Sequence, residues 1–342
     1  MLDISFKNKN ILVTGGCGAI GSNLVKYLIK TDVSKIVVLD NLSSSQEWNL
    51  EENKKVLMVK GDIRKDIDLK RCFNENINYV FHLAAFFANQ NSVDYPEIDL
   101  SVNGNGTLKL LQYSHMCNVE RFIYASSGCS IYGKEPTLPV KEDLNSMHLS
   151  SPYQITKMLG ELYCNYYLNH FGLEVVKARF FNSYGPGEIP GQYRNVIPNF
   201  IYWAMQGKEI PITGNTEMTR DFTYVEDIVN GLILCAVTND INGEEFNLAS
   251  GKEIKIVELA EKINKLVGNN ARIKYFEKRK WDTKNRMLAS IDKAGKLLGY
   301  KPKTQFDDGL NNTIDWFKTN WDMIKNNSSF SPGMSSAVRY KK

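Results

Sequence analysis

Tyr153 and Lys157 are the residues whose types and spacing point most directly to proton transfer. They lie four positions apart in a segment that begins Ser150-Ser151-Pro152 and is apolar at helical spacing. Both side chains should therefore share one face near the start of a helix. A tyrosine with its ordinary pKa of about 10 is a poor base at neutral pH, but a nearby ammonium group favours the phenolate. The pair predicts a tyrosine base assisted by a lysine.

A glycine-rich loop near the N-terminus gives this pair its context, since the same spacing often arises by chance. Gly15-Gly16-Cys17-Gly18-Ala19-Ile20-Gly21 follows a β-rich run at 10–14 and opens a helical pattern at 19–30. Glycines in such a loop allow a tight turn, close approach to a pyrophosphate and helix–strand contact, and the helix N-terminus attracts the phosphates. The loop predicts a dinucleotide site, whose oxidised nicotinamide would add a second positive charge favouring the phenolate.

Asp40 ends the second predicted strand, nineteen residues after Gly21. A carboxylate there can accept hydrogen bonds from an adenosine ribose and would repel a 2′-phosphate. Asn41 follows it and the next twenty residues contain no arginine, which favours NAD over NADP. The alternative is a solvated aspartate in a turn. Gly61-Asp62-Ile63 is a similar candidate for the adenine edge, although Gly-Asp is also an ordinary turn.

These residues need a scaffold, and the hydrophobic pattern predicts an α/β one. Apolar runs of strand length occur at 10–14, 36–39, 56–59, 79–83, 121–125 and 173–178, with helical stretches between most of them. Strands without polar alternation are covered on both faces, which is typical of a doubly wound, Rossmann-type parallel sheet. Ser126-Ser127 would then stand at the carboxyl end of a strand, where ligands and catalytic groups converge.

The rest of the chain predicts a smaller α+β substrate lobe. Loops rich in Gly and Pro occupy 182–214, a short helix is expected around 199–205, further helices at 225–237, 256–267 and 309–318, and a strand at 272–276. We expect an NAD-binding domain at 1–180, a substrate lobe at 181–325, with parts of 220–250 packing back onto the first domain, and a flexible tail at 326–342.

Composition narrows the class of protein. The 342 residues are 43% hydrophobic and 23% charged, with a net charge of +4 and six scattered cysteines. These values exclude a disordered or coiled-coil chain, and make nucleic-acid binding and disulfide bonding unexpected. The longest apolar run, 79–88, is too short to span a membrane and contains His82, which we interpret as a core histidine. We expect a soluble, cytoplasmic protein without a metal site.

The motifs together resemble the extended short-chain dehydrogenase/reductase family, and within it the nucleotide-sugar epimerases of the UDP-glucose 4-epimerase type. The resemblance covers most of the chain. It rests on the glycine loop, Asp40-Asn41-Leu42-Ser43, Gly61-Asp62, His82-Leu83-Ala84-Ala85, Asn103 with Gly106-Thr107, Ala125-Ser126-Ser127, Tyr132-Gly133, Pro152-Tyr153 with Lys157, Arg179-Phe180-Phe181-Asn182 with Tyr184-Gly185-Pro186, and Thr219-Arg220-Asp221-Phe222.

The resemblance implies NAD as a tightly held cofactor and a catalytic trio of Ser127, Tyr153 and Lys157. Tyr153 would remove a sugar hydroxyl proton during hydride transfer, Ser127 would hydrogen-bond the same oxygen, and Lys157 would hold the nicotinamide ribose. The cofactor-binding residues would be Gly15, Gly18, Ala19, Ile20, Gly21, Asp40, Asn41, Ser43, Asp62, Ile63, Leu83, Ala84, Ala85, Asn103, Tyr153 and Lys157.

The same resemblance implies a nucleotide-diphosphate sugar as substrate. Asn182 and Arg220 would contact the diphosphate, the segment from Val196 through Asn199 to Phe200 would cover the base, and Arg279 or Arg286 would supply a second phosphate contact, spacing alone not deciding which. An ion pair with Asp227 or Glu226 is the alternative for Arg220. A homodimer is also implied, built from helices at about 99–117 and 153–171.

The loop after Ser127 departs from the family pattern. Four residues, Gly128-Cys129-Ser130-Ile131, precede Tyr132 where many members have three. Dehydratases carry an Asp-Glu pair here, so dehydration is disfavoured. Cys129 matches a cysteine of the 3,5-epimerases, but the lysine that those enzymes place shortly before the counterpart of Arg194 is missing. Cys129 is thus either a second acid/base or, more simply, a small buried thiol.

The sequence favours an NAD-dependent epimerase acting at C4 through a transient keto-sugar. The alternatives are another nucleotide-sugar enzyme on the same scaffold (3,5-epimerase, dehydrogenase or reductase, decarboxylase, dehydratase) or a non-catalytic NAD-binding scaffold.

Overall fold

A seven-stranded parallel sheet forms the centre of the computed structural model, which describes residues 6–134, 136–279, 282 and 284–330. The strand order is β11-β6-β5-β4-β1-β2-β3. The strands are β1 (Asn10–Thr14), β2 (Lys35–Asp40), β3 (Val56–Lys60), β4 (Tyr79–His82), β5 (Arg121–Ser127), β6 (Val175–Phe180) and β11 (Glu245–Leu248). Six of them match the apolar runs, and the Rossmann-type sheet predicted from those runs is confirmed.

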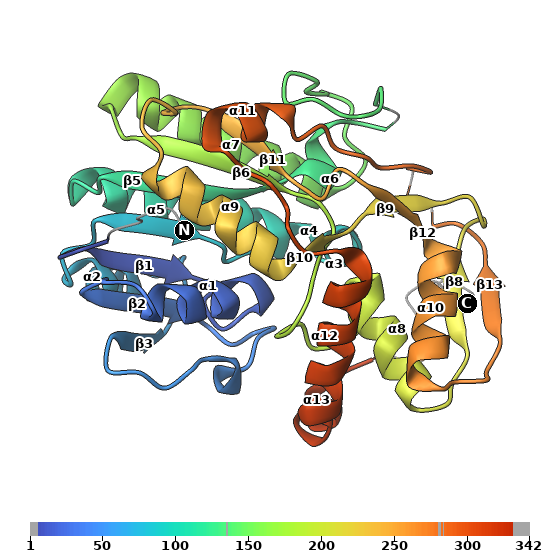
Figure 1. Ribbon diagram of the computed structural model, residues 1–342. Helices are drawn as coiled ribbons and strands as arrows, with labels where there is room; N and C mark the ends of the chain where they lie inside the picture. The colour runs from blue at the N-terminus through green and yellow to red at the C-terminus, as the bar shows by residue number, and fades with distance from the viewer. Residues whose placement is uncertain (1–5, 135, 280–281, 283, 331–342) are drawn as a thin grey trace.

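Helices cover both faces of this sheet, as its uniformly apolar strands require. One face packs against α1 (Ala19–Ile29), α9 (Val225–Val237) and α11 (Asp292–Leu298), which lie toward the viewer in Figure 1. The other face packs against α2 (Asp66–Phe73), α5 (Thr107–Met116) and α7 (Pro152–Phe171). Both faces of the sheet are thereby removed from water.

The strand order changes direction at β1, whose neighbours are β2 and β4. In register, Ile11 lies opposite Ile36 of β2 on one side and Tyr79 of β4 on the other. The crevice at such a switch point, beyond the carboxyl ends of the strands, is where doubly wound sheets bind ligands. The glycine loop, the end of β4 and the serines that end β5 all open toward it.

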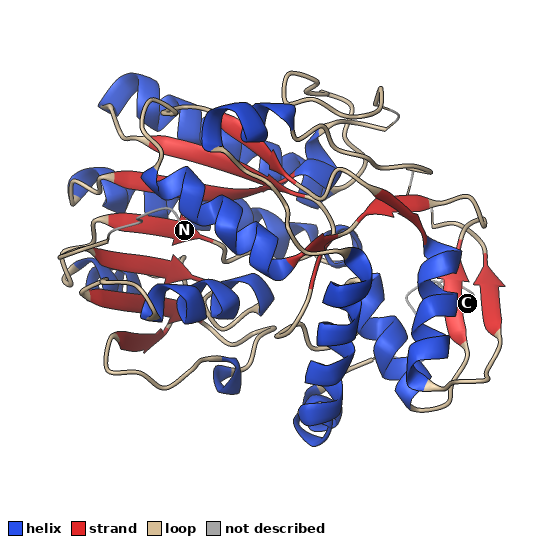
Figure 2. Cartoon of the chain, viewed as in Figure 1, coloured by secondary structure: helices blue, strands red, loops and turns tan. Residues whose placement is uncertain are grey.

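A second hydrophobic core lies beside the sheet, at the right of Figures 1 and 2. It is built from α8 (Val196–Met205), α10 (Ile256–Val267), α12 (Phe306–Thr319) and α13 (Trp321–Asn327), together with the parallel pair β8 (Ile210–Thr213) and β13 (Ile273–Phe276). The helices expected at 225–237 and 256–267 have the predicted bounds.

Short elements connect the two cores. They are η1 (Glu47–Asn49), α3 (Asn89–Asp94), α4 (Pro96–Asp99), the π-helical segment η2 (Leu100–Gly106), α6 (Gly128–Ile131), β7 (Ser183–Tyr184), β9 (Thr219–Asp221), β10 (Thr223–Tyr224) and β12 (Glu253–Lys255). β7 pairs with β10, and β9 pairs with β12. These short strands carry the chain from the sheet to the second lobe.

Several segments differ from expectation. The strands β8 and β11 and the helices α11 and α13 were not predicted; β11, for example, has the sequence EFNL, in which polar residues interrupt the apolar ones. Residues 326–330, expected to belong to the tail, pack on the second lobe instead: α13 continues to Asn327, and the Phe330 ring stacks on Tyr202 with centroids 5.4 Å apart. The rest of the expected tail, 331–342, lies outside the described residues.

Candidate active site

The glycine loop is shaped by close backbone contacts. Gly15 has a φ of +71°, and a Cβ on it would lie 2.7 Å from the backbone nitrogen of Ala84. A Cβ on Gly21 would lie 2.2 Å from the Gly15 carbonyl oxygen, so α1 can meet the loop only at glycine. Gly18 precedes α1, and among the described side chains none caps this end. Its N–H groups are thus available to a pyrophosphate, as the cofactor prediction requires.

Asp40 is fixed against this loop and is not a solvated turn residue. It is 7% exposed and accepts hydrogen bonds from the backbone N–H groups of Cys17 (3.0 Å) and Leu42 (2.9 Å) and from the Ser45 hydroxyl (2.7 Å). These bonds hold the carboxylate at the end of β2, beside the phosphate loop. The residues present therefore fit the ribose of a dinucleotide.

Asp62 lies close to Asp40 in the fold, after β3. Its carboxylate pairs with Arg64 (2.6 Å) and accepts from the Asn41 amide (3.4 Å). The Arg64 guanidinium lowers the pKa of Asp62 to about 2. The candidate adenine edge is thus a rigid, ionised group, with Ile63 buried beneath it. Ala19 and Ile20 begin α1, and Ser43 lies in the loop after Asp40.

His82 is a core histidine, as expected. Its two ring nitrogens lie 2.8 Å from the hydroxyls of Thr14 and Thr107, and burial lowers its pKa to about 3. The Thr14 hydroxyl also accepts from the backbone N–H of Ala84 (3.2 Å). His82 therefore ties the ends of β1 and β4 to α5 and leaves the Leu83–Ala85 backbone at the crevice.

The predicted trio converges at the end of β5. Ser151 caps α7 by accepting from the Gln154 N–H, and Tyr153 and Lys157 follow on one buried face. The Lys157 ammonium donates to the Ala125 carbonyl (2.9 Å) and lies 5.7 Å from the centroid of the Tyr153 ring. Ser127 is adjacent, since a hydrogen bond between it and Tyr153 acts to lower the pKa of the phenol.

The protonation state of Tyr153 differs from the simple expectation. Burial is the largest influence and raises the pKa of this phenol well above its usual value, with Asp99 and Cys129 adding to the rise. Burial also lowers the pKa of Lys157 to about 8. The chain alone thus keeps the tyrosine protonated, and formation of the phenolate depends on positive charge brought to the site with the cofactor.

Two supporting residues escaped the sequence analysis. The Ser130 hydroxyl donates to the Ser127 hydroxyl oxygen (2.8 Å), which leaves the Ser127 proton free to point elsewhere. The wholly buried Asp99 accepts from Thr156 (2.7 Å) and from the Asn103 amide (2.8 Å). Asn103 lies in η2, and its side-chain oxygen accepts from the Phe86 N–H (2.8 Å). These bonds fix α7 against the loop that follows β4.

A buried ion pair connects α7 to the two neighbouring strands β5 and β6. The Arg179 guanidinium of β6 lies 2.7 Å from the Glu161 carboxylate of α7. Glu161 also accepts from the Ser126 hydroxyl (2.5 Å), the residue before Ser127. The pair therefore connects the catalytic helix to the strand that carries the catalytic serine.

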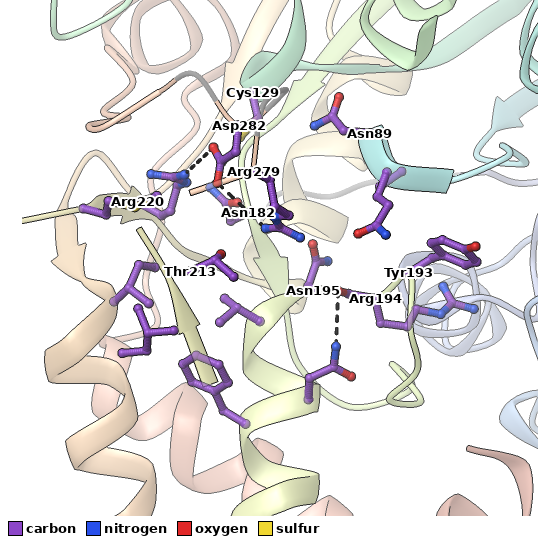
Figure 3. A pocket seen from close by; sticks show the side chains of 18 of the residues that line it. Asn89, Cys129, Asn182, Tyr193, Arg194, Asn195, Thr213, Arg220, Arg279 and Asp282 are labelled. Carbon is purple, nitrogen blue, oxygen red and sulfur yellow. Dashed lines mark hydrogen bonds and ion pairs between the residues drawn. The ribbon is translucent and has the colours of Figure 1, made fainter. Parts of the chain in front are cut away.

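A polar pocket opens beside the trio, between the sheet and the second lobe (Figure 3). Five of the candidate substrate-binding residues line it: Asn182, Val196, Asn199, Arg220 and Arg279. Cys129, a candidate catalytic residue, also lines it, whereas Ser127, Tyr153 and Lys157 are not among the lining residues. The Asn199 side-chain amide also forms two hydrogen bonds with the backbone of Gly191 (2.9 and 3.0 Å). Asn199 therefore fixes the loop that contains Gly191, in addition to lining the pocket.

The arginines have the following partners. Arg220 pairs with Asp282 (3.2 Å), which also lies 3.8 Å from Arg279, so the alternative considered for Arg220, a pairing with Asp227 or Glu226, is not the one found. Asp227 instead accepts from the backbone N–H groups of residues 303 and 304. Arg286 pairs with Glu253 (2.5 Å). Of the two candidates for a second phosphate contact, Arg279 lines the pocket and Arg286 does not.

Cys129 lines the pocket, at the top of the view in Figure 3, and its hydrogen-bond partners were not predicted. Its sulfur accepts from the Asn182 amide (3.3 Å), and its carbonyl accepts from the Lys284 ammonium (2.6 Å). Burial raises the pKa of the Cys129 thiol. A lysine thus stands beside this cysteine, supplied by a distant segment and not by the one before Arg194.

The packing around Gly128 excludes the Asp-Glu pair that dehydratases carry directly after the catalytic serine. A Cβ on Gly128 would lie 2.0 Å from the Phe181 ring, so no side chain fits at this position without movement. Neither aspartate nor glutamate could replace it.

The described residues set limits on other chemistry. Among them no group of three or more His, Cys, Asp or Glu side chains is arranged to hold a metal ion. The six cysteines are free thiols. In the described part of the chain, no helix is both long and apolar enough to cross a membrane.

The fold and the crevice define a dinucleotide-binding enzyme of the Rossmann class, with a second lobe and a pocket lined by two arginines. Comparison with known proteins agrees: the sequence model of the "NAD dependent epimerase/dehydratase family" matches residues 11–249. The chain belongs to this family, which confirms NAD, predicted from the glycine loop and Asp40, as the cofactor.

Individual relatives are similar over nearly their whole length. "Epimerase Mth375" of Methanothermobacter thermautotrophicus is 52% identical, with a TM-score of 0.94 over 95% of this chain and 96% of that one. The UDP-glucose 4-epimerase of Mycolicibacterium smegmatis is 33% identical over 90% of this chain and 98% of its own. The UDP-glucuronate 4-epimerase of Thermodesulfobacterium geofontis is 34% identical over 92% and 98%.

Proposed function

We propose that this protein epimerises a nucleotide-diphosphate sugar at C4 through a transient keto-sugar. The observation that carries the proposal is the convergence of Ser127, Tyr153 and Lys157 at the end of β5, next to a pocket that is lined by their sequence neighbours Cys129 and Gln154 and holds two guanidinium groups. A sugar placed between them would meet an acid/base at one end and diphosphate ligands at the other. The relatives named as 4-epimerases support the reaction type.

Each group of the trio has a separate task in this proposal. NAD, which the glycine loop and Asp40 would hold, would supply the hydride acceptor and donor for C4. Tyr153 takes the proton of the C4 hydroxyl and later gives it back. Ser127, held by Ser130, hydrogen-bonds the same oxygen. Lys157 supplies positive charge beneath the tyrosine ring and so favours the phenolate.

The pocket supplies the binding energy. Arg220 and Arg279 are suited to bidentate contact with phosphate oxygens, and Asn182 lies between them and the reacting end. Because the diphosphate is fixed while the keto-sugar is not bonded to the protein, the ring can turn and present its other face. Asp282 orients both guanidinium groups before the ligand arrives.

We propose a cytoplasmic homodimer as the working form. Apolar side chains stand exposed on α7 and α5, the helices expected to form the interface: Ile155, Leu162, Tyr166, Phe171 and Met116. Exposed apolar clusters of this kind are typical of protein–protein contact surfaces.

Replacing Tyr153 with phenylalanine tests the function. The enzyme should interconvert a sugar nucleotide and its C4 epimer without net accumulation of NADH, and Tyr153→Phe should slow this about 100-fold or more, the usual contribution of a general base. Tyr275→Phe, at an exposed tyrosine of β13 outside the pocket and outside the proposed interface, is the matched control and should keep full activity. Unchanged activity of Tyr153→Phe would rule out this base, and stoichiometric NADH would indicate a dehydrogenase.

A further inference from the structure

Lys284 is a buried cation to which the proposed reaction assigns no role. It lines the pocket, is 8% exposed and donates to the carbonyl oxygen of Cys129 (2.6 Å). An ammonium group has three N–H donors, so this bond leaves capacity for a ligand. Among the described residues, no carboxylate forms an ion pair with it: Asp282 acts on the Lys284 charge only from a longer distance and is itself paired with Arg220 and Arg279. Lysines are seldom this buried without an anionic partner, which points to a ligand as the partner.

The two arginines of the pocket have a different position. Arg220 and Arg279 lie on either side of Asp282, and Figure 3 shows the three groups together. Planar guanidinium groups so arranged match the several oxygens of a diphosphate. Lys284 instead reaches the turn after the catalytic serine, and presents a single point charge there.

That turn belongs to the reacting end of the pocket. Cys129 is two residues from Ser127, and it lines the pocket together with Lys284, whose ammonium is bonded to its carbonyl oxygen. A sugar whose C4 hydroxyl met Tyr153 would therefore have the substituents next to C4 close to Lys284. The substituent on C5 is a neutral hydroxymethyl group in a hexose and a carboxylate in a uronic acid.

We propose that Lys284 binds the carboxylate of a nucleotide-diphosphate uronic acid and so selects acidic over neutral sugars. This assignment rests on the proposed function and specifies its substrate class. Burial lowers the pKa of Lys284 to about 8, which still leaves it largely protonated at neutral pH, and a bound carboxylate would strengthen the protonated form. The 34% identical relative named for UDP-glucuronate is consistent with a sugar of this class.

Binding measured without turnover tests the assignment. In the NAD-loaded Tyr153→Phe protein, the dissociation constants of UDP-glucuronate and UDP-glucose, which differ only at C6, are determined by calorimetry. UDP-glucuronate should bind about 10- to 100-fold more tightly, the usual value of a charged hydrogen bond. Lys284→Met should remove this advantage and leave UDP-glucose within about twofold. Lys301→Met, the same charge change at an exposed site outside the pocket, should change neither.

The outcomes separate this assignment from the proposed function. Equal binding of the two sugars to the Tyr153→Phe protein, or equal weakening of both by Lys284→Met, overturns the carboxylate assignment and leaves the epimerase proposal standing. Absence of binding by either sugar overturns the carboxylate assignment for uridine nucleotides, while the epimerase proposal, which names no nucleotide, is then decided by the activity test on Tyr153→Phe. If Lys284→Met does not fold, as judged by circular dichroism, Lys284→Gln replaces it, and the comparison in the Lys284-containing protein remains decisive. Activity retained by Tyr153→Phe refutes only the catalytic proposal.

Discussion

Glu161→Gln offers a sharp test of the ion pair beneath the catalytic strand. The carboxylate accepts from Nε (2.9 Å) and Nη2 (2.7 Å) of Arg179, and the two side chains are only 5% and 1% exposed. Glutamine keeps the size of the side chain but leaves the guanidinium charge without a counter-charge. Removing one partner of a buried pair costs about 3–5 kcal/mol of the free energy of unfolding, and we expect a loss in this range.

The assay is urea denaturation of the NAD-free protein, followed by circular dichroism, with the loss read from the midpoint. Glu174→Gln is the matched control, because Glu174 pairs with Arg121 (2.8 Å) but is 45% exposed. Its loss should stay below about 1 kcal/mol. A double variant, Glu161→Leu with Arg179→Met, removes both charges and should cost less than Glu161→Gln alone. If Glu161→Gln loses no more stability than Glu174→Gln, then Glu161 does not stabilise the protein by neutralising the buried charge of Arg179.

Two further predictions concern Gly128 and His82. Gly128→Ala should lower the free energy of unfolding by about 1–3 kcal/mol and remove most of the activity, because its Cβ would overlap the Phe181 ring. Gly172→Ala is the control: Gly172 has a φ of +69° and open space around it, so alanine there should lower the free energy of unfolding by only about 1–2 kcal/mol, the cost of a left-handed backbone. Equal effects of the two variants on activity would contradict the steric argument. The pKa of His82 is about 3 when folded, so between there and its unfolded value of about 6.5 the unfolded chain binds more protons. Stability should therefore fall as the pH falls through this range, by up to about 1.4 kcal/mol per pH unit, and His82→Gln should lessen the decline of the urea midpoint between pH 7.5 and 5; a parallel decline in both proteins would show that other groups cause it.

Local patterns allowed much of the sheet and the cofactor loop to be predicted. Strands such as 10–14 and 121–125 are short apolar runs buried on both faces, and the glycines of 15–21 form a recognisable local pattern, although Gly15 is required by a contact with the distant Ala84. Asp40 could be placed because a ribose is bound at the end of the strand that follows the glycine loop. These features leave a local pattern in the sequence.

The substrate side depended on contacts between distant segments, and there the sequence was less informative. Asp282 and Lys284 reach the pocket from a loop after β13, and no periodicity in that loop indicates which side chains face inward. The partner of Arg220 lies 62 positions away, whereas the acidic residues near it in the sequence begin α9 and bond elsewhere. Which of Arg279 and Arg286 lines the pocket likewise depends on the course of the backbone in this loop.

The course of the chain between the two cores also bears on how substrate preference can change in evolution. After β6 the chain enters the second lobe at α8, returns to the sheet with α9 and β11, enters the lobe again with α10, contributes α11 to the sheet, and ends in the lobe with α12 and α13. No single crossover in the gene would exchange one complete lobe for another. New specificity on this scaffold must therefore arise by point substitutions and loop changes at positions that line the pocket, as Lys284 does.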